Sequence, residues 1–135
     1  MPKLNKKKVV LIHPFTEAPP FGLLSIASFL KKNGKLVKIV AYTKKDIPLK
    51  QILKDIEGAD IIGISVYTKP MIKQACEITR KIRKNFNGLL IWGGVHATLF
   101  PEKSIKDMDL DGIIINEGEK TFLELVDALE NKKSI

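Results

Sequence analysis

The stretch that decides the fold is Leu89–Thr98, with the sequence LLIWGGVHAT. Its first four residues are apolar and predict a short strand that is buried on both faces. The chain is then expected to turn on Gly93-Gly94, just before His96. Paired glycines let another group approach the backbone closely, because no Cβ stands in the way. In an open α/β sheet, ligands bind outside the carboxyl ends of the strands, so this loop is predicted to form one wall of a ligand site.

Outward from this stretch, apolar runs alternate with amphipathic segments along the whole chain. Each apolar run predicts a parallel strand, and the prolines and glycines between the runs are placed as helix starts and stops. Five strands joined by helical crossovers predict a three-layer α/β/α flavodoxin-like (Rossmann-like) domain, whose five-stranded parallel sheet has the order 2-1-3-4-5. The expected strands are Val9–His13, Leu36–Ala41, Asp60–Val66, Leu89–Trp92 and Gly112–Ile115.

The helices between these strands follow from apolar residues at helical spacing. Helices are expected to start near Pro20, Pro48 and Pro70, and a last helix turns Phe122 inward. A further short helix is expected at Pro101–Asp107. Within the third strand, Gly63 is expected to thin the surface of the sheet where a helix or a ligand packs.

The composition is that of a single globular domain spanning residues 1–135. The chain is 44% hydrophobic and 28% charged, and its formal net charge is +8. The lysines are scattered without interleaved aromatic residues, so nucleic-acid binding is the least favoured of the functions considered. No apolar run approaches the roughly 20 residues that cross a bilayer. The single cysteine, Cys76, excludes an internal disulfide, and a cytoplasmic location without membrane contact is expected.

Several cofactor-binding and catalytic motifs do not occur. The G-x-G-x-x-G and G-x-x-x-x-G-K-[ST] patterns are missing, which disfavours a nicotinamide dehydrogenase and a P-loop nucleotidase. The first strand ends in His13-Pro14 rather than in acidic residues, which disfavours a phospho-acceptor receiver domain. Cys76 lies on the apolar stripe of a helix and is expected to be a small core residue rather than a nucleophile. No catalytic residue is therefore predicted on this chain.

The candidate site residues follow three strands that are neighbours in the predicted order. Small residues there would leave a broad, shallow shelf suited to a large planar ligand. Simpler alternatives stay open: Ser65 could cap a backbone group, Gly93-Gly94 could only turn the chain, and Gly118 could only begin the last helix. The candidate cofactor-binding residues are Ser65, Tyr67, Thr68, Gly93, Gly94, His96, Glu117 and Gly118.

A known family shares this set of motifs. The segments PPFGLLSIASFLKKNG, DIIGISVYT, LLIWGGVHATLFPE and GIIINEGEKTFLELVDAL make the chain, from about Val9 to Leu129, resemble the N-terminal cobalamin-binding domain of cobalamin-dependent radical S-adenosylmethionine enzymes. The resemblance implies that a corrin ring lies over the strand ends and that its nucleotide tail runs down beside the sheet. It also implies roles for the matching residues: Ser65 would contact the tail or the ring edge, Gly93 and Gly94 would let the tail pass, Glu117 and Gly118 would border the other side, and His96 would sit at the rim.

Two departures from related proteins sharpen this expectation. The Asp-x-His-x-x-Gly motif, whose histidine ligates cobalt in many cobalamin proteins, is missing, because Leu11 and Gly94 stand two residues before His13 and His96. Neither histidine is therefore predicted to be a metal ligand. A single cysteine also cannot hold the iron–sulfur cluster of a radical enzyme, which needs three. The cluster and S-adenosylmethionine are thus expected only in a radical S-adenosylmethionine domain that follows this chain or acts as its partner.

The resulting hypothesis is a cobalamin-binding module that serves methyl transfer or a related radical reaction. The alternative is a flavodoxin-like protein-interaction domain that has lost its cofactor. In that alternative, Tyr67, Trp92 and Phe100 would form a protein-contact patch near the glycine loop.

Overall fold

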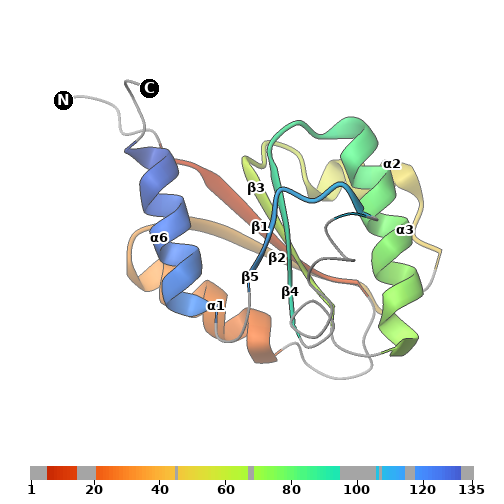
Figure 1. Cartoon of the computed structure of the whole chain (residues 1–135), viewed down its shortest axis with the longest axis horizontal. Coiled ribbons are helices and arrows are strands. Elements are labelled where there is room, and N and C mark those ends of the chain that lie inside the picture. Colours follow the sequence, from red (N-terminus) through yellow and green to blue (C-terminus); the bar gives the residue numbers. More distant parts are fainter. Residues whose placement is uncertain are drawn as a thin grey trace.

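Five parallel strands form one sheet, with helices on both of its faces (Figure 1). The computed structural model describes residues 6–14, 21–44, 46–66, 69–94, 106, 108–114 and 118–131. The sheet order is β2-β1-β3-β4-β5, with every neighbouring pair parallel, which confirms the predicted flavodoxin-like architecture. The elements are β1 (Lys8–His13), α1 (Phe21–Lys32), β2 (Leu36–Ala41), α2 (Leu49–Asp55), β3 (Ile61–Ser65), α3 (Lys69–Asn85), β4 (Leu89–Gly93), β5 (Gly112–Ile114) and α6 (Glu119–Glu130).

Each face of the sheet has its own hydrophobic core, because successive strand residues point to opposite faces. Helices α1 and α6 cover one face, and α2 and α3 cover the other (Figure 1). On the α1/α6 face, Leu11 and Ile91 pack with Phe122 and Val126 of α6. On the α2/α3 face, the buried residues include Ile12, Ile64, Leu90 and Trp92 from the strands and Ile52, Ala75, Ile78 and Ile82 from the helices.

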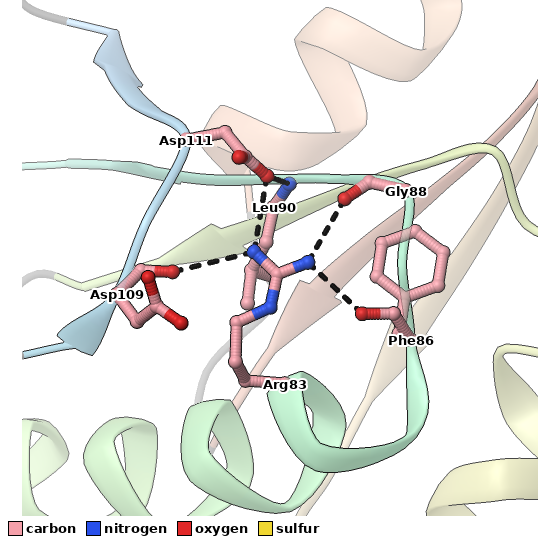
Figure 2. Close-up of polar contacts among 6 residues, drawn as sticks. All are labelled: Arg83, Phe86, Gly88, Leu90, Asp109 and Asp111. Carbon is pink, nitrogen blue, oxygen red and sulfur yellow. Dashed lines mark hydrogen bonds and ion pairs between the residues drawn. The ribbon is translucent and has the colours of Figure 1, made fainter.

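Arg83, near the end of α3, links the amino-terminal ends of β4 and β5 (Figure 2). Its guanidinium donates hydrogen bonds of 2.9 to 3.3 Å to four acceptors: the carbonyl oxygens of Phe86, Gly88 and Asp109 and the carboxylate of Asp111. The same Asp111 carboxylate accepts the backbone N–H of Leu90 at 2.8 Å. One side chain therefore joins the end of α3 to the starts of β4 and β5.

One glycine, Gly93, departs from its expected place, and a second, Gly63, has the role that was expected of it. Gly93 is the last residue of β4 and pairs with Ser65, so only Gly94, at a φ of 106°, turns the chain. A Cβ on Gly63 would lie 3.1 Å from both the Phe122 ring and the Leu11 side chain. Gly63 therefore makes room for helix α6. Of the two alternatives that the sequence left open, a helix or a ligand against Gly63, the structure shows the helix.

The proposed contact patch of the interaction-domain alternative is wrong at Trp92. Its side chain is 1% exposed and lies in the α2/α3 core. Its indole N–H donates to the Thr79 hydroxyl at 2.9 Å, and that hydroxyl donates to the Ala75 carbonyl at 2.6 Å. Trp92 is therefore part of the packing under α3, whereas Tyr67 and Phe100 lie outside the described residues.

Three smaller expectations concern Cys76, a short helix and membrane-spanning segments. Cys76 packs, partly buried, against the α2/α3 core, as expected for a small apolar residue. Nearly all of the helix expected at Pro101–Asp107 lies outside the described residues. Over the ranges that the structure describes, no helix is long and apolar enough to cross a membrane.

Candidate functional site

The carboxyl ends of β1, β3, β4 and β5 form one row of residue positions on the α1/α6 face. Ser65 pairs with Gly93, and Gly93 pairs with Ile114. Ile12 pairs with Ile64, so His13 stands beside Ser65 one position further along. Because Leu11 and Ile91 belong to the α1/α6 core, the residues two positions later point to the same face. We call His13, Ser65, Gly93 and Ile114 the terminal row.

Ser65 is the buried polar group of this row whose hydroxyl lacks a partner. Its side chain is 3% exposed, and its Oγ has no hydrogen-bond partner among the described residues. The expected alternative, a cap on a neighbouring backbone group, is therefore not found there. Burying a hydroxyl without a hydrogen bond costs about 1–3 kcal/mol. A ligand atom that reaches this hydroxyl would recover that free energy.

Gly93 and Gly94, beside Ser65, are glycines for different reasons. Among the described residues, a Cβ on Gly93 would have the Ile114 carbonyl oxygen as its nearest neighbour, at the ordinary contact distance of 3.8 Å. A Cβ on Gly94 would lie 2.6 Å from the Val66 carbonyl oxygen. Gly94 is therefore required by the backbone, whereas no described residue occupies the Cβ position of Gly93, which pairs with Ser65.

Gly118 lies where α6 meets α1, at the β5 end of the terminal row. It is buried, and a Cβ on it would lie 3.3 Å from both Ile114 and Ile26. Next to it, the Ser25 hydroxyl of α1 donates to the Glu119 carboxylate of α6 at 2.6 Å. We call Ser25, Ile26, Ile114, Gly118 and Glu119 the α1–α6 seam. Gly118 is the N-cap residue of α6, in agreement with the simpler alternative that the sequence left open, and it also keeps this seam narrow.

His13 is the titratable member of the terminal row. It is buried at the end of β1, and its carbonyl oxygen accepts the backbone N–H of Tyr42 at 3.0 Å. Burial lowers the pKa of the imidazole from its ordinary value of 6.5, because it disfavours the charged form of the ring. In the described part of the chain, no group of three or more His, Cys, Asp or Glu side chains could hold a metal ion.

The structure thus gathers only some of the predicted site residues. Ser65, Gly93 and Gly94 lie together, and Gly118 lies at the same edge of the sheet. The remaining candidates, Tyr67, Thr68, His96 and Glu117, lie outside the described residues.

Sequence reasoning missed some members of this region. His13 could have been placed beside Ser65 by combining the end of the first strand with the order 2-1-3. Ser25 and Glu119 are 94 positions apart, and no sequence pattern signals their contact.

These residues fit a large ligand that carries hydrogen-bonding groups at its edge. A buried hydroxyl that has no partner among the described residues would bind such a group, and no described residue fills the Cβ position of Gly93 beside it. Neither feature requires a metal ligand from the protein. The described residues are thus compatible with a cofactor that brings its own metal, such as a corrin, and they supply no cluster of ligands for a bare ion.

Comparison with known proteins gives the same ligand class. A family model described as the B12 binding domain matches residues 7–126. An uncharacterized methyltransferase of Pyrococcus horikoshii is 33% identical over 143 aligned residues, which cover 95% of this chain and 30% of the relative.

Two solved structures of the radical S-adenosylmethionine methyltransferase TsrM from Kitasatospora setae share the fold. One, with tryptophan and an S-adenosylmethionine analogue bound, superposes with a TM-score of 0.86 at 18% identity, over 96% of this chain and 27% of that chain. The other, with cobalamin and a [4Fe-4S] cluster bound, gives 0.84 at 19% identity, over 96% of this chain and 25% of that chain. This chain thus spans between a quarter and a third of the length of these proteins. Because the family model matches most of its length, the chain belongs to the B12-binding domain family.

Proposed function

We propose that this domain holds cobalamin over the carboxyl ends of β3 and β4 and presents it to a radical S-adenosylmethionine domain in the same chain or in a partner. The observation that carries the proposal is the buried Ser65 hydroxyl, which has no hydrogen-bond partner among the described residues and stands beside Gly93, a residue without a side chain. Because the chain belongs to the B12-binding domain family, we assign this hydroxyl to a polar group of the cofactor.

Each residue of the site has a distinct part in this proposal. Ser65 forms a hydrogen bond with the nucleotide tail or the ring edge, and Gly93 leaves room for the tail beside it. Gly94 fixes the turn that ends β4, and Gly118 borders the cofactor on the side of α6. Tyr67, Thr68, His96 and Glu117 are proposed to complete the rim of the site.

The reaction itself is proposed to take place in a second domain. Bound cobalamin supplies a cobalt centre that can accept and pass on a methyl group. A cluster held by three cysteines cannot form on a chain with one cysteine, so the cluster and S-adenosylmethionine are assigned to the partner domain. The methyltransferase relatives support methyl transfer as the reaction class.

Retention of hydroxocobalamin tests the binding proposal. The purified domain is mixed with the cofactor at tens of micromolar, free ligand is removed, and the visible spectrum is recorded. We expect the wild-type domain to keep corrin absorbance. A wild-type domain that retains none under these conditions contradicts the proposal.

Three variants make the test specific to the site. Ser65→Ala should weaken binding on the order of tenfold, since about 1.4 kcal/mol of hydrogen bonding is lost. It should not destabilise the ligand-free domain, because the removed hydroxyl has no partner among the described residues. Gly93→Val should block the tail sterically. Gly112→Ala is the matched control, because it lies on β5 and its Cβ would meet nothing within 4 Å.

The second half of the proposal is tested in the gene. A Cys-x-x-x-Cys-x-x-Cys motif is expected in the same reading frame or in a neighbouring gene. Its absence from both places would contradict the assignment to a radical enzyme and leave cobalamin binding to be judged by the spectra.

A further inference from the structure

The α1–α6 seam borders the terminal row, and one polar contact spans its outer side. Ile114 belongs to both, because it pairs with Gly93 and also lies next to the Cβ position of Gly118. Any ligand that lies on the terminal row under α1 and α6 therefore has this seam as its boundary. The contacts that hold the seam closed therefore affect how firmly such a ligand is held.

The polar contact is the hydrogen bond from the Ser25 hydroxyl to the Glu119 carboxylate. At 2.6 Å it has the short length that is typical of an O–H group bonded to a charged oxygen. The hydrogen bond from Ser25 and one from the backbone N–H of Glu119 lower the pKa of this carboxyl group. Glu119 is therefore ionised at neutral pH, and the contact is a charge-assisted one.

The neighbours of these two residues meet inside the seam. Ile26 follows Ser25, Gly118 precedes Glu119, and the Ile26 side chain lies 3.3 Å from the Cβ position of Gly118. A separation of Ser25 from Glu119 would thus move Ile26 and Gly118 apart directly.

The other end of α6 is anchored independently. Lys35 forms ion pairs with Asp127 and Glu130, and Glu130 also accepts the backbone N–H of Lys7 at 2.9 Å. These contacts lie near the carboxyl terminus of α6, away from the seam. Loss of the Ser25–Glu119 bond would therefore loosen α6 locally before Phe122, which stays packed in the core, while the carboxyl-terminal end stays fixed.

We propose that Ser25 and Glu119 are positioning residues that keep the α1–α6 seam closed on bound cobalamin and so slow its release. The inference rests on the proposed function, because it concerns the retention of the same ligand. Neither residue needs to touch the cofactor. Surface contacts of this kind contribute little to global stability, whereas local opening depends on the few contacts that it breaks.

The test measures the release of hydroxocobalamin from preloaded domains by removing free ligand and following the retained absorbance over time. Ser25→Ala and Glu119→Ala should each speed release about three- to tenfold, the effect of losing one hydrogen bond. The double variant should release no faster than either single variant, because both remove the same bond. Ser25→Thr, which keeps the hydroxyl, should restore slow release. Ser28→Ala and Glu124→Ala, at exposed positions on the same two helices, are the matched controls.

The thermal midpoint of each ligand-free variant separates positioning from general stability. We expect midpoints close to wild type together with the faster release. The inference is overturned if both single variants release at the rate of the controls, or if their effects multiply in the double variant. A wild-type domain that retains no cobalamin refutes the proposed function itself. If the wild type retains cobalamin and the variants release it equally slowly, only the inference about the seam is refuted.

Discussion

Replacing Gly94 by alanine should destabilise the domain severely. The backbone φ of 106° lies in a region that residues with a Cβ rarely adopt, at a cost of about 1–3 kcal/mol. The new methyl group would lie 2.6 Å from the Val66 carbonyl oxygen and 3.0 Å from its carbonyl carbon and its nitrogen. Val66 cannot easily move away, since its N–H donates to the Gly93 carbonyl at 2.8 Å. Forcing the backbone apart adds about 1–3 kcal/mol.

The two contributions give a loss of about 2–6 kcal/mol in the free energy of unfolding. Urea unfolding followed by far-ultraviolet circular dichroism measures it. The matched control is Gly93→Ala, whose Cβ would have its nearest neighbour at 3.8 Å and whose free energy of unfolding should stay within about 1 kcal/mol of wild type. If Gly94→Ala unfolds at the same urea concentration as Gly93→Ala, the reasoning from the turn is refuted.

Three further predictions concern other parts of the molecule. Arg83→Met keeps the side-chain stem but removes four hydrogen bonds, including the ion pair with Asp111. It should lower the free energy of unfolding by about 2 kcal/mol. An equal loss in the control variant Arg80→Met, at an exposed position of the same helix, would contradict this. Because burial lowers the pKa of His13, the unfolded chain binds that proton more readily, so stability should fall as the pH drops below about 6.5, and His13→Gln should flatten this part of a stability–pH curve. Trp92→Phe removes the donor to Thr79 and should cost about 1–3 kcal/mol by thermal unfolding, whereas a midpoint equal to wild type would show that this bond contributes nothing.

The sheet could be predicted from the sequence because its strands are continuous apolar runs. A parallel strand that is buried on both faces, such as Ile61–Ser65, is apolar at nearly every position instead of alternating with polar residues, and this pattern is easy to recognise. Strand order then followed from the alternation of strands and helices. The ends of the elements could not be predicted as closely. Gly93 continues β4 because Ser65 and Ile114 pair with it, and no local sequence pattern indicates that pairing.

The candidate site was predictable only where it follows the strands directly. Ser65 and Gly93 are strand-end residues, so topology alone brings them together. The seam was not predictable, because the contact between Ser25 and Glu119 depends on how α1 and α6 pack. The same limit explains the error at Trp92, whose burial depends on α3 lying over β4.

The position of Trp92 also has an optical consequence. It is the only tryptophan of the chain, its ring is fixed by the Thr79 hydrogen bond, and it directly precedes Gly93. Its fluorescence therefore arises from one known point beneath the strand ends. Corrins absorb in the near-ultraviolet range where indole emits, so a corrin at this edge of the sheet would quench the emission by energy transfer. The native domain thus carries an intrinsic reporter of occupancy that needs no added dye.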